Sequence, residues 1–70
     1  MKKIDLKDYD RVKEISSYNH NYYKHKINKS MILVECDEYF NEISIYSVEG
    51  NEEYFLFNCP DNQDGVFIDE

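Results

Sequence analysis

The residues of this sequence that are best suited to chemistry are carboxylates, and they gather in its second half. Residues 31–70 contain eleven acidic side chains and no Lys or Arg, whereas residues 1–30 contain all eight basic side chains and four acidic ones. The formal charges of the two halves are therefore −11 and +4, which sum to the net charge of −7. Charge asymmetry of this kind indicates an electrostatic partner. An acidic surface repels nucleic acids and membranes and attracts basic proteins.

Carboxylates at this density can also imitate a nucleic-acid backbone. Residues on one face of a strand recur every ~7 Å, which is comparable to the spacing of phosphates along one strand of DNA. Such a surface could occupy the nucleic-acid-binding groove of an enzyme. The alternative is a solvated acidic face that contributes only to solubility.

Aromatic residues lie among these acids and are candidate anchors for a partner. Tyrosine supplies buried area together with a hydrogen-bonding hydroxyl at protein interfaces, although the same residues could form ordinary cross-strand core pairs. The predicted partner-binding residues are Glu35, Asp37, Glu38, Tyr39, Phe40, Glu42, Tyr46, Glu49, Glu52, Glu53, Tyr54, Asp61 and Asp64.

The sequence offers little that favours catalysis. Neighbouring carboxylates such as Glu52-Glu53 would point to opposite sides of a strand. There is no Gly-rich phosphate loop and no recognisable nucleophile motif. We therefore expect a protein that is not an enzyme.

Metal and direct nucleic-acid binding are also weakly supported. His20, His25, Cys36 and Cys59 could ligate zinc, but only the two histidines are closely spaced, and no metal or other cofactor is expected. The basic, aromatic segment 22–29 could stack on single-stranded bases, but the net charge opposes this. A contact between this segment and the acidic half is the alternative.

The first element predicted is a helix from about Leu6 to about Ser17. Asp5 is suited to be its N-cap, with its carboxylate accepting from the backbone N–H of Asp8. Apolar residues recur every three positions at Leu6, Tyr9, Val12 and Ile15, which gives a broad apolar stripe. Residues 18–30 then fit either a short edge strand, in which Tyr23, His25 and Ile27 alternate with lysines, or a helical extension from Tyr18 to Lys26.

The remaining apolar segments read as strands. Residues 31–36 are predicted to form a central strand, followed by strands at 43–48 and 53–58. Gly50-Asn51 is a two-residue hairpin turn, and Pro60 ends the last of these strands. Residues 66–68 could add a short strand or dock on an open sheet face.

The hairpin turn also fixes a register. Pairing Glu49 with Glu52 is predicted to place Tyr46 opposite Phe55, Ile45 opposite Leu56 and Ile43 opposite Asn58. One sheet face would then carry Ile43, Ile45, Tyr54 and Leu56, and the other Tyr46, Val48, Phe55 and Phe57. Because one helix cannot cover both faces, one face should remain available for a partner, for a second copy or for the C-terminal segment.

These elements predict an α+β fold in one domain spanning residues 1–70, with one N-terminal helix packed on a three- to five-stranded antiparallel sheet. The acids at positions 5, 8 and 10 interrupt any N-terminal signal sequence. No segment approaches the ~18 apolar residues of a membrane helix. A cytoplasmic location is therefore expected, with Cys36 and Cys59 as reduced thiols.

In size, acidity, abundance of Lys, Asn, Ile and Tyr, and absence of enzymatic motifs, the chain resembles the small inhibitor proteins that phages and mobile elements encode, such as anti-CRISPR and other DNA-mimic proteins. The resemblance is one of general character and assigns no individual residue. It implies inhibition of a nuclease or other DNA-binding protein by occupation of its basic surface. Alternatives are a self-associating structural or regulatory module, in which the second sheet face pairs with its own copy, and an immunity-type protein that neutralises one toxin.

Overall fold

The computed structural model describes residues 2–36, 43–59 and 64–69, which form seven β-strands and no α-helix. A single 3₁₀ turn, η1 (Leu6–Asp8), separates the first two strands. The strands are β1 (Lys2–Asp5), β2 (Tyr9–Arg11), β3 (His20–His25), β4 (Met31–Cys36), β5 (Ile43–Glu49), β6 (Glu52–Asn58) and β7 (Val66–Asp69).

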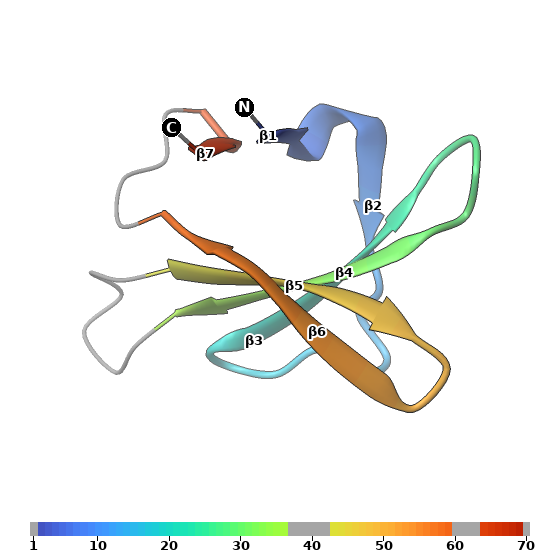
Figure 1. Ribbon diagram of the computed structural model, residues 1–70. Helices are drawn as coiled ribbons and strands as arrows, with labels where there is room; N and C mark the ends of the chain where they lie inside the picture. The colour runs from blue at the N-terminus through green and yellow to red at the C-terminus, as the bar shows by residue number, and fades with distance from the viewer. Residues whose placement is uncertain (1, 37–42, 60–63, 70) are drawn as a thin grey trace.

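The strands are arranged in two antiparallel sheets (Figure 1). Strands β2 to β6 form a five-stranded meander in which each strand pairs with the next along the chain. The first and last strands, β1 and β7, pair with each other in a separate two-stranded sheet. Figure 1 shows this small sheet at one end of the twisted larger one, with both chain termini beside it.

The core lies between the small sheet and one face of the large sheet. Ile4 of β1 and Phe67 of β7 are buried against residues of β4, β5 and β6. Phe67 and Ile45 are only 1% and 0% exposed. The buried cluster consists of Ile4, Ile32, Val34, Ile43, Ile45, Phe57, Cys59 and Phe67. The pairing of the two termini thus takes the covering role that the sequence analysis gave to a helix.

The prediction of an α+β fold is wrong, because the segment expected to be a helix forms a turn and an edge strand. Asp5 is indeed an N-cap, but its Oδ1 accepts from the backbone N–H of Lys7 at 3.0 Å and begins only the turn η1. Tyr9–Arg11 then pairs with β3, and the Tyr9 ring meets the His25 ring edge-on at 4.9 Å. An isolated helix of about twelve residues is marginal in water, so strand pairing prevails.

Residues 20–25 form a strand, as one of the two interpretations of this segment predicted, and the helical extension is wrong. The strand is not at the edge, however, because β2 pairs with its outer side. The connection from β2 is fixed by backbone bonds to β3, such as Val12 N–H to the Tyr22 carbonyl at 2.7 Å. The predicted central strand β4 is confirmed.

The β5–β6 hairpin follows the predicted register near its turn and departs from it further on. Glu49 pairs with Glu52 and Tyr46 with Phe55, as predicted. A register irregularity then places Ile45 opposite Phe57 rather than opposite Leu56. Phe57 therefore joins the core and is 4% exposed, whereas the prediction placed it on the opposite face. A bulge inserts one unpaired residue and reverses the side to which later residues point.

Candidate functional site: an open sheet face beside an acidic hairpin

The face of the large sheet that points away from the core carries a row of apolar and aromatic side chains. The registers align Tyr22 of β3, Leu33 of β4, Tyr46 of β5 and Phe55 of β6 across four strands. Neighbouring residues Met31 and Val48 form a second apolar pair. We call this surface the open face, defined by Tyr22, Met31, Leu33, Tyr46, Val48 and Phe55. Within the described ranges, the core-forming small sheet contacts the opposite face.

The open face is concave. The Tyr22 hydroxyl, on β3, donates a hydrogen bond of 2.7 Å to Oε2 of Glu53 on β6, so the two side chains reach across β4 and β5. Three interstrand spacings of ~4.8 Å separate these strands in a flat sheet, and the bond is possible because the strongly twisted sheet curves inward. Leu33, between the two strands, is 1% exposed.

The Tyr22–Glu53 bond also affects the titration of the phenol. The hydrogen bond to the Glu53 carboxylate raises the pKa of Tyr22 above its ordinary value of 10.0, and partial burial and the negative charges of Glu53 and Glu35 raise it further. The phenol is therefore protonated, and remains a donor, throughout the physiological pH range.

The aromatic row ends at an exposed side chain on the sheet edge. Phe55 is 56% exposed, although its ring meets Tyr46 edge-on with centroids 5.8 Å apart. It lies on β6, a seven-residue strand at the end of the strand order. Large exposed apolar side chains on an edge strand are typical of a surface that receives another chain.

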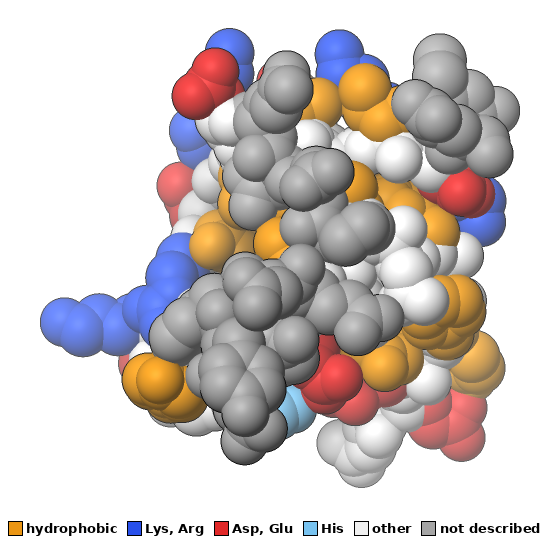
Figure 2. Space-filling model, turned by 90° about the vertical axis from the view of Figure 1, so that its left-hand side faces the viewer, with side chains coloured by type: hydrophobic (Ala, Val, Ile, Leu, Met, Phe, Trp, Pro, Cys, Tyr) orange, Lys and Arg blue, Asp and Glu red, His pale blue; other side chains and the backbone are white. Residues whose placement is uncertain are grey.

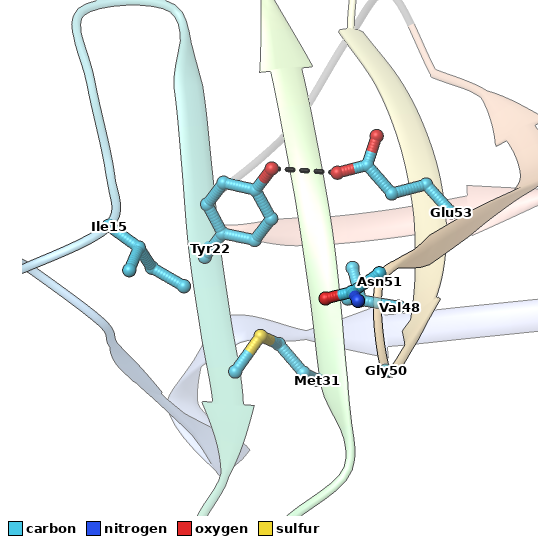
Figure 3. A pocket seen from close by; sticks show the side chains of 7 residues that line it. All are labelled: Ile15, Tyr22, Met31, Val48, Gly50, Asn51 and Glu53. Atoms are coloured by element: carbon cyan, nitrogen blue, oxygen red, sulfur yellow. Dashed lines mark hydrogen bonds between the residues drawn. The ribbon is translucent and has the colours of Figure 1, made fainter.

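A hollow of about 430 Å³ lies in the open face, between the turn after β2 and the β5–β6 turn (Figure 3). Its walls combine apolar side chains with one carboxylate and contain no Lys or Arg. The lining residues are Ile15, Tyr22, Met31, Val48, Gly50, Asn51 and Glu53. In Figure 3 the Tyr22–Glu53 bond closes one end, Met31 lies at the other, and Ile15 points in from the side.

Beside this hollow, the tip of the β5–β6 hairpin concentrates negative charge. Gly50 has a φ of 62°, as the first position of a type II′ turn requires. The turn places Glu49 directly opposite Glu52, with Glu53 next along the strand. We call Glu49, Glu52 and Glu53 the acidic tip. Like charges directly opposite each other destabilise a hairpin, so this arrangement does not serve stability.

Tyrosines rather than cations accompany these carboxylates. The hydroxyl of Tyr54 donates a hydrogen bond to Oε2 of Glu52. This hydrogen bond and, to a smaller extent, the negative charge of Glu49 raise the pKa of Tyr54. Among the residues that the structure describes, one basic side chain reaches a carboxylate: Nε2 of His20 lies 2.8 Å from Oε2 of Glu35, a contact that becomes an ion pair only when the histidine is protonated. The acidic tip therefore has no Lys or Arg within salt-bridge distance in the described structure.

The structure brings only part of the predicted site together. Glu49, Glu52, Glu53, Tyr46 and Tyr54 share the β5–β6 hairpin. Glu35 lies at the far end of β4, and Asp64 lies beside β7 and the small sheet. In Figure 2 the visible Asp and Glu side chains likewise form separate groups. Predicted site residues Asp37, Glu38, Tyr39, Phe40, Glu42 and Asp61 lie outside the described residues.

Tyr22, Met31 and Ile15 belong to the site but were missed by the sequence analysis. Tyr22 could have been found from the alternation of side chains along 20–25, had that segment been aligned with β4. Ile15 carried no such signal, because it was assigned to the apolar stripe of a helix. Its position follows from the turn at 13–15, which leaves its side chain 51% exposed at the hollow.

Within the described part of the chain, no group of three His, Cys, Asp or Glu side chains is placed to hold a metal ion. Cys59 is buried and Cys36 half-buried at the edge of the core. No helix in the described ranges is long and apolar enough to cross a membrane.

Comparison with known proteins adds no relative. No protein-family model matches the sequence, and no curated protein or solved structure matches it significantly. Function is therefore inferred from the residues and geometry of the site itself.

Proposed function

We propose that this chain is a protein-binding domain that places its open face and acidic tip on a basic protein surface. The observation that carries the proposal is the acidic tip, where the carboxylate of Glu53 borders the open face near the exposed Phe55. Glu49 and Glu52 face the other side of the same hairpin end, and no Lys or Arg of the described residues pairs with any of the three. Aromatic side chains provide buried contact area at an interface. Uncompensated carboxylates accelerate association with a partner of opposite charge.

The biochemical consequence that we propose is inhibition. A basic surface that accepts the carboxylates of a hairpin end is commonly one that accepts phosphates, so occupation of that surface by this domain excludes nucleic acid. A nuclease or another DNA-binding protein is the class of target. The domain itself then needs no catalytic group, and its effect depends on stoichiometric occupation.

The test begins with affinity capture at low salt from a bacterial lysate, followed by purification of the captured basic protein. Fluorescence anisotropy then measures whether the domain displaces a labelled 20-base-pair duplex from it. We expect displacement that weakens steeply with added salt, because exposed charge pairs are screened. Displacement that is unchanged between 50 and 300 mM NaCl would contradict the proposal.

A matched pair of double variants distinguishes the contribution of the acidic tip to affinity from that of the overall net charge. Glu49→Lys with Glu52→Lys should reduce affinity for the partner at least about tenfold, since like-charge contacts cost several kcal/mol. Asp8→Lys with Glu14→Lys changes the net charge equally at two exposed positions on other elements. The second variant should retain most of the affinity. Equal losses in both would show that overall charge, rather than the hairpin, determines binding.

A second candidate function, self-association, is favoured by the exposure of β6. This strand has seven residues, contains no Lys or Pro, and carries Tyr54 and Phe55 at 47% and 56% exposure. Edge strands of this kind pair with one another unless charge prevents it. Sedimentation velocity at 0.3 M NaCl should then show a dimer that Phe55→Lys converts to monomer. A monomer at all concentrations would exclude this candidate.

A further inference from the structure

The hollow in the open face has a composition that is specific for one kind of ligand. Apolar side chains of Ile15, Met31 and Val48 form its sides and base, and Glu53 supplies its one charge. A basic side chain has the same two parts, since Lys and Arg carry an apolar stem and a cationic head. A carboxylate ligand would be repelled by Glu53, and a purely apolar ligand would gain nothing from the charge of Glu53.

Glu53 is held in position and retains capacity to bind. Its Oε2 accepts from the Tyr22 hydroxyl at 2.7 Å, and among the described residues no donor is bonded to Oε1. A carboxylate has about four acceptor positions, so a guanidinium or ammonium group can still donate to it. The bond to Tyr22 fixes the carboxylate at the end of the hollow, which lowers the entropy lost when a cation binds.

The Tyr22 ring contributes a second attraction for a cation. Figure 3 looks onto the face of this ring from the open side, with Glu53 next to its hydroxyl. A cation over the face of an aromatic ring is attracted by the negative potential of the ring. A planar guanidinium can stack flat on the ring while its N–H groups in the same plane donate to the carboxylate, whereas an ammonium group is a compact, strongly hydrated point charge.

We propose that the hollow is a subsite for a basic side chain of the partner protein, with arginine preferred over lysine. The stem lies between Ile15, Met31 and Val48, and the guanidinium binds Glu53 beside the Tyr22 ring. This inference rests on the proposed function, since it identifies which residue of a basic partner enters the open face. It distinguishes Glu53 from the other carboxylates of the acidic tip, because Glu49 and Glu52 do not line the hollow.

The test uses small probes, so it does not require the partner. Two-dimensional ¹⁵N NMR titrations compare N-acetyl-L-arginine N-methylamide with its neutral isostere, the citrulline derivative, at low salt. We expect the arginine probe to shift the amide signals of Tyr22, Met31, Val48 and Asn51. The citrulline probe should bind at least about threefold more weakly, as expected for loss of one exposed charge pair. The lysine derivative should fall between them.

Three variants assign the effect to Glu53. Glu53→Gln should reduce binding of the arginine probe to the level of citrulline, whereas Glu52→Gln, which removes a neighbouring charge outside the hollow, should leave it unchanged. Tyr22→Phe removes the hydroxyl that positions Glu53 but keeps the ring and the Glu53 charge, so affinity for the arginine probe should fall, though less than in Glu53→Gln.

Equal binding of arginine and citrulline would overturn the subsite, as would arginine shifts that persist in Glu53→Gln. The two proposals fail separately. If a basic protein binds the acidic tip while the arginine probe does not enter the hollow, the proposed function stands and the subsite is wrong. If the arginine probe binds the hollow but no basic protein is captured or displaced from DNA, the subsite stands and the inhibitory function is wrong.

Discussion

Tyr22 and Glu53 are the pair of residues that connects opposite sides of the open face. One comes from the basic half of the chain and the other from the acidic half, 31 residues apart in sequence. Neither residue type is unusual by itself. Their hydrogen bond acquires significance because it lies over a concave apolar surface and fixes the carboxylate that borders the hollow.

At the residue scale we predict that the pKa of Tyr22 depends on the carboxylate of Glu53. A hydrogen bond to Glu53 raises the pKa of Tyr22, so the folded protein holds the phenolic proton more tightly than the unfolded chain does. The stabilisation that results is fully present below the unfolded pKa of about 10 and is lost as the pH rises through the folded pKa. Ultraviolet titration should show the Tyr22 pKa falling in Glu53→Gln. An unchanged titration curve in that variant would contradict the assignment.

At the scale of elements, the two-stranded sheet is what leaves one face of the large sheet open. Strands β1 and β7 come from opposite ends of the chain and cover only the core face. Phe67 of β7 is the largest fully buried side chain in the described structure. The adjacent residue on the same strand, Ile68, points away from the core and is 41% exposed.

Phe67→Ala should therefore destabilise the whole domain. Removal of a buried Phe side chain costs about 3–5 kcal/mol, which is a large share of the ~5–15 kcal/mol that stabilises a typical domain. Ile68→Ala is the matched control and should cost less than about 1 kcal/mol. Urea unfolding followed by circular dichroism measures both values. Similar losses for the two variants would show that the small sheet is not packed on the core as described.

At the scale of the whole molecule, the strands of the meander lie across the large sheet in the order in which they occur in the sequence. Because each of the strands β2 to β6 pairs with the next, β2 and β3 of the basic first half lie at one side of the large sheet, and β5 and β6 of the acidic second half lie at the other. The small sheet is the exception, since β1 pairs with β7 and places Lys2 opposite Asp69. In the large sheet the β5–β6 hairpin is thereby kept away from the basic strands, and no Lys or Arg forms a salt bridge with a carboxylate among the described residues. The separation leaves the acidic tip available to a partner.

This separation predicts an unusual dependence of stability on salt. The net charge is −7, and repulsion among the excess negative charges destabilises the compact state. Raising NaCl from about 10 to 150 mM shortens the screening length from ~30 to ~8 Å, so the free energy of unfolding should increase. Glu49→Gln with Glu52→Gln should reduce this increase. A decrease in stability with salt would show that attraction between the two halves dominates instead.

Sequence patterns predicted the strands better than they predicted what covers them. Alternation and β-branched content identified residues 31–36, 43–48 and 53–58, and Gly50-Asn51 identified the turn. The N-terminal error arose because the spacing of Leu6, Tyr9, Val12 and Ile15 fits a helix locally, whereas β3 offers the same segment a set of backbone partners. A bulge likewise has no signal in an alternating apolar strand, so the placement of Phe57 could not be predicted.

The sequence by itself determined the charge segregation, the acidic hairpin with its turn, and the presence of more apolar strand surface than one helix could cover. These properties are local, because composition and the two-residue turn do not depend on distant contacts. Only the tertiary structure decided that the chain ends pair and cover one face, that the other face curves inward, and that Tyr22 meets Glu53. Those features require long-range pairing, whose register and curvature depend on how all the strands fit around one small core.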